Sequence, residues 1–415
     1  MRKVFNLIGH PLFAGSFIMI FGSNAVSFLN YIYHIVMPRM LGPANYGEVA
    51  AIISLIGLLG VIPGSLNLVI IKYISSAKND EEVSSLISWL KNKVLITSLF
   101  FSLAIFLVSP FISSFLHINK IYYLILVSVS LLFSIQSLFN RSVLQGVLRF
   151  KEMVISMLAE NIIKLLAGIL LVYLGFQVGG AMAGLVISAF FGWYITNFFL
   201  HYQGRQTNVV KINSRQVLAF TIPVLIQSMA VTSLYSSDVI LVKHFFSSHD
   251  AGIYAALSNL GKIIFFGAGP ISAVMFPLVA KRNAKGENYK KIFILSLLAT
   301  VLFSISILLL YWLYPNLAIS LLFGAKYLEA ANLLVWFGLF MTLFTLSSLF
   351  ISYSLSLEKT SIVILPFIAA IGQIILIWFF HQTLYTVIII SIISAALLLA
   401  SLLIYSILYG KRILI

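Results

Sequence analysis

Four ionisable side chains lie inside long apolar stretches of the sequence: Glu160, Lys164, Asp238 and Lys262. A charge surrounded by lipid is costly, so an ionisable residue in such a stretch marks a substrate or ion pathway by default. Two lysines at similar depth would suit a phosphate-bearing substrate, because an ammonium is a compact phosphate-binding charge. The two carboxyl groups, Asp238 and Glu160, are candidates for coupling transport to an ion gradient.

Each of these residues also has a purely structural interpretation. Glu160 and Lys164 are four positions apart, which places them on one helix face where they could form an internal ion pair. Lys262 has no acidic residue three or four positions away, but it could pair with a distant acid or extend toward the membrane surface. Asp238 lies near the end of its stretch and could be a capping charge in wet surroundings. The sequence leaves these alternatives open.

Polar side chains recur at helical spacing beside the charged ones. Tyr254, Ser258 and Lys262 follow at four-residue intervals and would form one polar face of a helix. A second stripe near the start of the chain consists of Asn24, Ser27, Asn30, Tyr31 and His34. Such groups suit a sugar, although they also join membrane helices through hydrogen bonds of about 0.6 kcal/mol. The candidate substrate-binding residues are therefore Lys164, Lys262, Asn24, Asn30, His34, Tyr235, Tyr254 and Ser258.

Two prolines, Pro63 and Pro270, fall near the middle of apolar stretches. Each removes a backbone hydrogen bond from a helix, so both are candidate hinges, although proline is frequent in membrane helices in any case. The sequence has no cysteine, its seven histidines are scattered, and it contains neither a nucleophile triad nor a phosphate-binding loop. We therefore expect no metal, no other cofactor and no enzymatic activity.

Long apolar segments must position all of these residues. Of the 415 residues, 61% are apolar and 9% are charged, whereas soluble domains carry about 25% charged residues. This composition excludes a water-soluble globular protein and a disordered chain. A span needs about 20 apolar residues, so we predict an all-α polytopic membrane protein. Its twelve transmembrane helices are expected near residues 12–38, 48–71, 90–110, 121–147, 153–174, 178–202, 216–242, 252–280, 290–313, 331–357, 360–380 and 384–409.

Basic residues are distributed unevenly over the predicted loops. With a cytoplasmic N-terminus, the cytoplasmic segments hold 20 basic residues and the opposite segments hold 4. Because cytoplasmic loops carry the excess of Lys and Arg, we predict that both termini are cytoplasmic, in a multi-pass protein of the cytoplasmic (inner) cell membrane. The asymmetry accounts for most of the net charge of +15, so no nucleic-acid partner is expected.

An internal repeat relates the two halves of the chain. The segment LGPANYGEVAA at 41–51 is similar to FSSHDAGIYAA at 246–256, with Gly47 aligned to Gly252 and Ala50 to Ala255. This predicts two pseudo-symmetric six-helix lobes, residues 1–203 and 216–415, joined by a cytoplasmic linker at 204–215. Transporters with parallel repeats place their substrate site between the halves, near the middle of the membrane.

The stretch at 22–75 resembles the N-terminal region of polysaccharide exporters, the oligosaccharide-lipid flippases of the multidrug/oligosaccharidyl-lipid/polysaccharide (MOP) exporter superfamily. The resemblance is carried by Arg39, by Leu41-Gly42 and Tyr46-Gly47, and by DAGIYAALSNLGKIIFF (250–266) with MFP (275–277) in the second half. It implies a MATE-like V-shaped bundle that moves an isoprenoid-diphosphate-linked oligosaccharide to the outer leaflet. Its implied partners are this lipid-linked substrate, membrane lipids, and H⁺ or Na⁺ as coupling ion.

Two rival functions remain open at this stage. Related drug exporters share the layout, but their acid-rich cavities suit cations, whereas two lysines balanced by two acids favour an anion here. A membrane-embedded glycosyl polymerase or ligase usually needs a large outer loop, and the predicted outer loops are short and nearly uncharged. The peptidoglycan-precursor branch usually has fourteen helices, so the predicted twelve argue against it.

Overall fold

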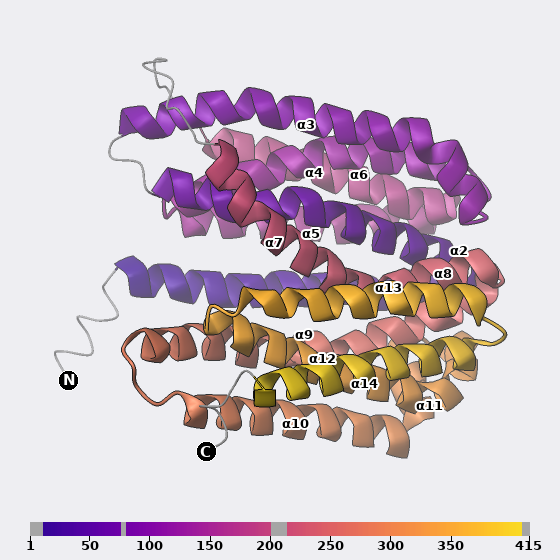
Figure 1. The fold of residues 1–415 in the computed structure, drawn as a ribbon. Coiled ribbons are helices and arrows are strands. Elements are labelled where there is room, and N and C mark those ends of the chain that lie inside the picture. Colours follow the sequence, from indigo (N-terminus) through magenta and orange to yellow (C-terminus); the bar gives the residue numbers. More distant parts are fainter. Residues whose placement is uncertain (1–10, 76–79, 201–213, 409–415) are drawn as a thin grey trace, which may run out of the picture. The chain divides into compact units, whose positions relative to one another are not determined.

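The computed structural model describes residues 11–75, 80–200 and 214–408, and every regular element in these ranges is a helix (Figure 1). The first part of the chain forms α2 (Pro11–Ser75), α3 (Asp80–Phe115), α4 (Tyr122–Gly146), α5 (Phe150–Leu171), η1 (Val172–Phe176) and α6 (Gln177–Phe199). The second part forms α7 (Ser214–Leu234), α8 (Ser237–Phe245), α9 (Ser248–Ala284), α10 (Lys290–Leu313), α11 (Pro315–Leu322), η2 (Ala325–Ala330), α12 (Ala331–Ser356), η3 (Thr360–Val363), α13 (Ile364–Phe379) and α14 (Leu384–Leu408).

The described residues contain nine helices that are long and apolar enough to cross a membrane, or ten if the bent pair α7 and α8 is one span. The prediction of a polytopic all-α membrane protein is therefore confirmed, but its count of twelve differs. Two of the nine helical stretches, Phe21–Asn67 with 47 residues and Phe150–Phe199 with 50, each run through two predicted spans. At 1.5 Å per residue, an uninterrupted helix of this length would measure about 70–75 Å, more than twice the membrane's hydrocarbon core.

Both long stretches contain a residue with non-helical backbone angles. Gly42 in α2 has φ 73° and ψ 171°, and Gly175 in η1 has φ 91° and ψ 5°. A positive φ is accessible to glycine without the steric cost that a Cβ would bring. The two glycines therefore mark the points where the chain changes direction between successive predicted spans.

The predicted helix at 216–242 is wrong as a single element, because α7 and α8 are bent by 47° between Leu234 and Ser237. The hydroxyl of Ser237 donates to the carbonyl of Ser233 at 2.6 Å, and the intervening Ser236 has a non-helical φ of −132°. Serine hydroxyls that bond to a carbonyl one turn back bend helices. Asp238 consequently lies in the first turn of a new helix, not near the end of an old one.

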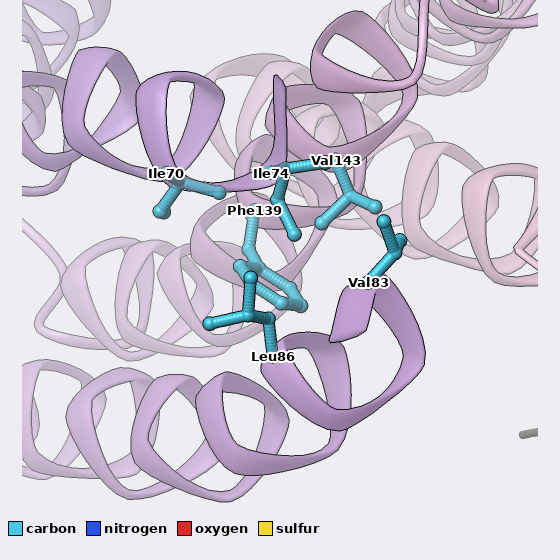
Figure 2. Packing of buried hydrophobic residues seen from close by; sticks show 6 residues of the cluster. All are labelled: Ile70, Ile74, Val83, Leu86, Phe139 and Val143. Carbon is cyan, nitrogen blue, oxygen red and sulfur yellow. The ribbon is translucent and has the colours of Figure 1, made fainter. Parts of the chain in front are cut away.

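The chain divides into two compact units: residues 1–41 with 62–221, and residues 42–61 with 222–415. In unit 1, α6 packs against α4 and α5, and α3 packs against α4. Figure 2 shows the apolar contact that joins the end of α2 to α3 and α4. Its buried side chains are Ile70, Ile74, Val83, Leu86, Phe139 and Val143.

In unit 2, α12 packs against α9, α10 and α14, and α13 packs against α14. Phe337 and Phe344 of α12 are buried; the ring of Phe337 meets that of Tyr254 in α9 edge-on, and the ring centre of Phe344 lies 4.9 Å from that of Phe265 in α9. Burial of these aromatic side chains fixes the rotation of α9. That rotation matters because α9 carries Tyr254, Ser258 and Lys262.

The two glycines related by the repeat lie at a close crossing inside unit 2. A Cβ on Gly47 would come within 2.5 Å of the carbonyl oxygen of Ser248, and one on Gly252 would collide with the backbone of Pro43. Small residues allow helix backbones to approach closely in membranes. Beside this crossing, the amide of Asn259 donates to the hydroxyl of Tyr46 at 2.7 Å.

Candidate functional site

The break between α7 and α8 presents a buried carboxylate to the polar face of α9. One oxygen of Asp238 accepts a hydrogen bond from the Tyr254 hydroxyl at 2.8 Å, and the other accepts from the backbone N–H of Val239 at 2.8 Å. Asp238 and Tyr254 are completely buried. Broken helices at membrane depth are tolerated where protein or a water-filled cavity satisfies the freed backbone groups, and they commonly carry ion and substrate sites.

Lys262 lies two helical turns after Tyr254 on the same face of α9. Its ammonium lies 5.5 Å from the ring centre of Tyr235, the residue in the α7–α8 break, and Asp238 attracts it electrostatically. The side chain is partly exposed, and none of the described residues accepts a hydrogen bond from it. Lys262 is therefore a cation whose three N–H donors remain available to a ligand.

Within unit 2, a series of buried polar groups connects Asp238 to α14 and α13. Tyr254 also interacts with Ser391 of α14, whose hydroxyl accepts from the amide of Gln373 in α13 at 2.9 Å. Ser258 is buried on α9, and its hydroxyl has no hydrogen-bond partner among the described residues. Sequence reasoning missed Gln373 and Ser391, although Gln373 is the only amide side chain in α13.

Unit 1 holds the second lysine in a different setting. The ammonium of Lys164 in α5 donates to the side-chain oxygen of Asn30 at 2.5 Å and lies 5.1 Å from the ring centre of Tyr33. Lys164 is half-buried and Asn30 is exposed. At 1.5 Å per residue, Lys164 lies about 21 Å along α5 from Phe150. The cation–π contact and the hydrogen bond fix the ammonium in place.

Glu160 forms its ion pair with Arg141 of α4 rather than with Lys164. Arg141 also donates to the hydroxyl of Ser156 at 3.1 Å, and both charged side chains are mostly buried. A Cβ on Gly192 of α6 would collide with the Glu160 carboxylate, so the glycine makes room for the pair. The ion pair expected within one helix is thus replaced by one between two helices, and Lys164 has no direct acidic partner among the described residues.

The repeat gives the two lysines equivalent neighbours. With the shift of 205 residues, Asn30 aligns with Tyr235, and Tyr33 aligns with Asp238. Lys164 contacts Asn30 and Tyr33. Lys262 interacts with the residues at the aligned positions, Tyr235 and Asp238. The lysines themselves come from different helices of their halves. Each lysine is therefore placed by the same two repeat positions, with a neutral pair of side chains in unit 1 and a carboxylate in unit 2.

The remaining predicted residues, Asn24, His34, Pro63 and Pro270, lie on α2 and α9. Asn24 is exposed on α2, and the half-buried ring of His34 meets that of Tyr33 edge-on. Pro63 is buried and α2 remains helical through it, whereas Pro270 is exposed within α9. No group of three or more metal-ligating residues occurs within the described ranges.

A buried charge pair near the glycine crossing was also missed. Glu48 is 2% exposed and Lys243 is 1% exposed, and they attract each other electrostatically. Lys243 donates to the hydroxyl of Ser248 at 2.8 Å. The sequence placed Lys243 in an outer loop because it ends an apolar run, but it occupies the last turn of α8.

Solved transporters share this fold. A multidrug resistance MATE family transporter of the MOP superfamily, in an inward-facing conformation, is 12% identical, with 93% of this chain and 96% of that chain covered and a TM-score of 0.74. The lipid II flippase MurJ, in an inward closed conformation, is 17% identical, with coverage of 93% and 87% and a TM-score of 0.70.

A third structure is a MOP superfamily transporter from Pyrococcus furiosus, for which reverse polarity of the binding pocket suggests a different function. It is 15% identical, with coverage of 98% and 97% and a TM-score of 0.61. At these identities the likeness establishes the fold alone.

Sequence comparison supplies the family. No curated protein matches this sequence. The model of the polysaccharide biosynthesis protein family matches residues 12–283, about two thirds of the chain. That match includes both lysines, the α7–α8 break and the glycine crossing. With an all-helical membrane fold shared with MOP transporters, the chain belongs to the polysaccharide biosynthesis protein family.

Proposed function

We propose that this protein flips an isoprenoid-diphosphate-linked oligosaccharide across the cytoplasmic membrane for surface polysaccharide biosynthesis, by alternating access. The family match and the fold shared with a lipid II flippase support a lipid-linked substrate. One observation carries the proposal: Lys164 and Lys262 are partly exposed within apolar helices, and neither is hydrogen-bonded to a carboxylate among the described residues. Such cations suit a substrate that brings its own negative charge.

Each lysine would offer N–H donors to phosphate oxygens of the diphosphate group. Lys164 uses one N–H for Asn30 and faces Tyr33, so it keeps donors for phosphate oxygens. Lys262 keeps all of its donors. A charge-assisted hydrogen bond is about twice as strong as a neutral one, which is why the diphosphate, not the sugar, would dominate affinity.

The neutral polar groups would contact the sugar while the isoprenoid chain stays in the lipid. Asn24, Asn30 and His34 lie on one stripe of α2, and Tyr254 and Ser258 lie on the polar face of α9. The free hydroxyl of Ser258 supports this role, because a buried hydroxyl without a partner costs about 1–3 kcal/mol unless a ligand or water satisfies it. Pro63 and Pro270 would act as hinges during alternating access.

An ion gradient would drive the direction of transport. Asp238 and Glu160 are the candidate coupling residues, and H⁺ or Na⁺ is the candidate ion. In this proposal the ion binds and leaves at one of these carboxyl groups during each transport cycle.

The decisive test measures surface polysaccharide in cells that lack their own flippase and express Lys164→Met or Lys262→Met. We expect export to fall about 10- to 100-fold, because a hydrogen bond to a charged group contributes about 1.5–3 kcal/mol. Lys151→Met and Lys281→Met are matched controls, since each removes an exposed lysine from the same helix, α5 or α9. Full export by both lysine variants, at normal membrane levels, would contradict the proposal.

An antiporter of organic cations is the competing function, favoured by the fold shared with a multidrug transporter. Purified protein in lipid vesicles separates the two. We expect a fluorescent isoprenyl-diphosphate sugar to cross the bilayer and become accessible to an external quencher. Proton-coupled efflux of organic cations without movement of the lipid-linked sugar would establish the antiporter instead.

A further inference from the structure

The two lysines differ in their electrostatic surroundings, although repeat-equivalent positions hold both. Lys164 is held by an amide and an aromatic ring, and its acidic neighbour Glu160 is already paired with Arg141. Lys262 is held by an aromatic ring and is attracted by Asp238. Among the described residues, Lys164 of unit 1 therefore has no carboxylate bonded directly to it, whereas the net charge around Lys262 of unit 2 depends on whether Asp238 is ionised.

Asp238 is well placed to change its charge. Its two oxygens accept from one phenol and one backbone N–H, both neutral donors, and no described residue forms a direct ion pair with it. Because it is completely buried, a nearby anion would repel its carboxylate strongly through a medium of low dielectric. A proton on Asp238 removes that repulsion and leaves the full charge of Lys262 to the anion.

Glu160 lacks this freedom. Its carboxylate is in direct contact with the guanidinium of Arg141, and a proton there would leave a mostly buried cation without its partner. Breaking one side of such a pair is strongly unfavourable. The geometry thus separates the two carboxyl groups that the sequence could not distinguish.

Other titratable groups also lie around α8, among them His244 in its last turn, whose ring stacks on Trp378. Tyr254 and Lys262 face Asp238 from α9, and Tyr235 lies in the break itself. Ser391 of α14 and Gln373 of α13 continue the series of buried polar groups, and neither side chain titrates. At the far end of α8, Lys243 interacts with Glu48, and the ring of His381 stacks on Phe245.

We infer that Asp238 and the diphosphate compete for Lys262, so that binding of the diphosphate is coupled to uptake of one proton by Asp238. This inference rests on the proposed function. On binding, the carboxylate gains a proton from solvent and becomes a neutral acid, while Lys262 remains an ammonium that now donates to phosphate oxygens. On release, Asp238 returns the proton and again balances Lys262.

The test is calorimetric titration of the purified protein with farnesyl diphosphate as the probe, in two buffers of different ionisation enthalpy. The difference in heat between buffers gives the protons taken up per ligand bound. For the wild-type protein we expect about one proton more than for Asp238→Asn, because protonation of the probe itself contributes equally to both. Asp238→Asn should bind at least as tightly as wild type, with a flatter dependence of affinity on pH.

Two further variants identify the groups involved. Lys164→Met should bind at least tenfold more weakly and keep the proton uptake. Lys262→Met should also bind more weakly but lose the uptake, because no cation remains for Asp238 and the ligand to share. If Asp238→Asn does not fold, as judged by size-exclusion chromatography, the contrast between the two lysine variants still decides.

The possible outcomes distinguish a failure of the proton-coupling inference from a failure of the proposed flippase function. Failure of the wild-type protein to bind the probe would overturn the proposed function, and the inference with it. Binding without proton uptake, or equal uptake by wild type and Asp238→Asn, would overturn the inference alone. Uptake that disappears in Glu160→Gln and persists in Asp238→Asn would assign the coupling to Glu160 instead.

Discussion

Single side chains decide which charges are available to a ligand. The sequence identified Lys164, Lys262, Asp238 and Glu160 because isolated charges are conspicuous in apolar helices. Their partners could not be predicted, since each comes from another helix and depends on how that helix is rotated. Glu160 is the clearest example: its neighbour four residues on is Lys164, but the ion pair joins it to Arg141, 19 residues earlier.

The contact between Lys164 and the ring of Tyr33 predicts that Tyr33→Leu lowers ligand affinity more than Tyr33→Phe does. Its hydroxyl has no hydrogen-bond partner among the described residues, so Tyr33→Phe removes nothing that Lys164 uses. Tyr33→Leu removes the π face, and we expect affinity for the isoprenyl diphosphate to fall by about 0.5–1 kcal/mol, or two- to fivefold. Calorimetric titration of both variants checks this. Equal weakening by Phe and Leu would show that the hydroxyl, not the ring, matters.

The Arg141–Glu160 pair predicts a non-additive effect on stability. Either Arg141→Met or Glu160→Gln alone leaves a mostly buried charge without its partner, and we expect each to lower the melting temperature of the purified protein. The double variant Arg141→Met/Glu160→Gln should be more stable than the worse single variant. Strict additivity of the two shifts, measured by thermal unfolding in detergent, would argue that the residues do not act as a pair.

At the scale of helices, apolar runs predicted where the elements lie, but not where they bend. At the break between α7 and α8, the hydroxyl of Ser237 donates to the carbonyl of Ser233, the hydroxyl of Ser233 contacts that of Ser237, and Ser236 has a non-helical φ. Serines are common in membrane helices, so these three gave no distinctive signal. The same limit applies to Phe21–Asn67 and Phe150–Phe199, in which the backbone leaves the helical conformation at Gly42 and at Gly175.

The crossing of α2 and α9 predicts that only one of two glycines on α9 tolerates a methyl group. A Cβ on Gly252 would collide with the backbone of Pro43, whereas one on Gly269 would meet nothing within 4 Å. We expect Gly252→Ala to destabilise the protein by about 1–3 kcal/mol through overpacking, and Gly269→Ala to have little effect. Thermal unfolding of both variants tests the contrast. Equal stability would mean that the crossing is loose in the membrane.

Across the whole molecule, the distribution of charged residues along the chain says more about function and membrane orientation than the net charge does. The net charge of +15 could have suggested nucleic acid, but the split of basic residues between the two sets of loops predicts membrane orientation instead. Composition and hydropathy were sufficient for the class of protein, because membrane helices must be apolar along their whole length. The arrangement of lysines, carboxylates and tyrosines required coordinates.

The predicted orientation can be tested directly, because the chain has no cysteine. A cysteine introduced at Lys285, after α9, should react with a membrane-impermeant maleimide only after the cytoplasmic side is opened. One introduced at Lys326, after α11, should react in intact cells. The reverse pattern would place both termini on the outside.

The middle of α2 belongs to a different unit from its two ends. Residues 42–61 group with unit 2, while the residues before and after them group with unit 1. One boundary falls at Gly42, with its non-helical backbone, and the other falls two residues before Pro63. The polypeptide thus passes between the two units twice within α2, once at a glycine with non-helical backbone angles and once close to a proline. Because a residue with a Cβ adopts a positive φ only at a steric cost, Gly42→Ala should lower the melting temperature of the purified protein.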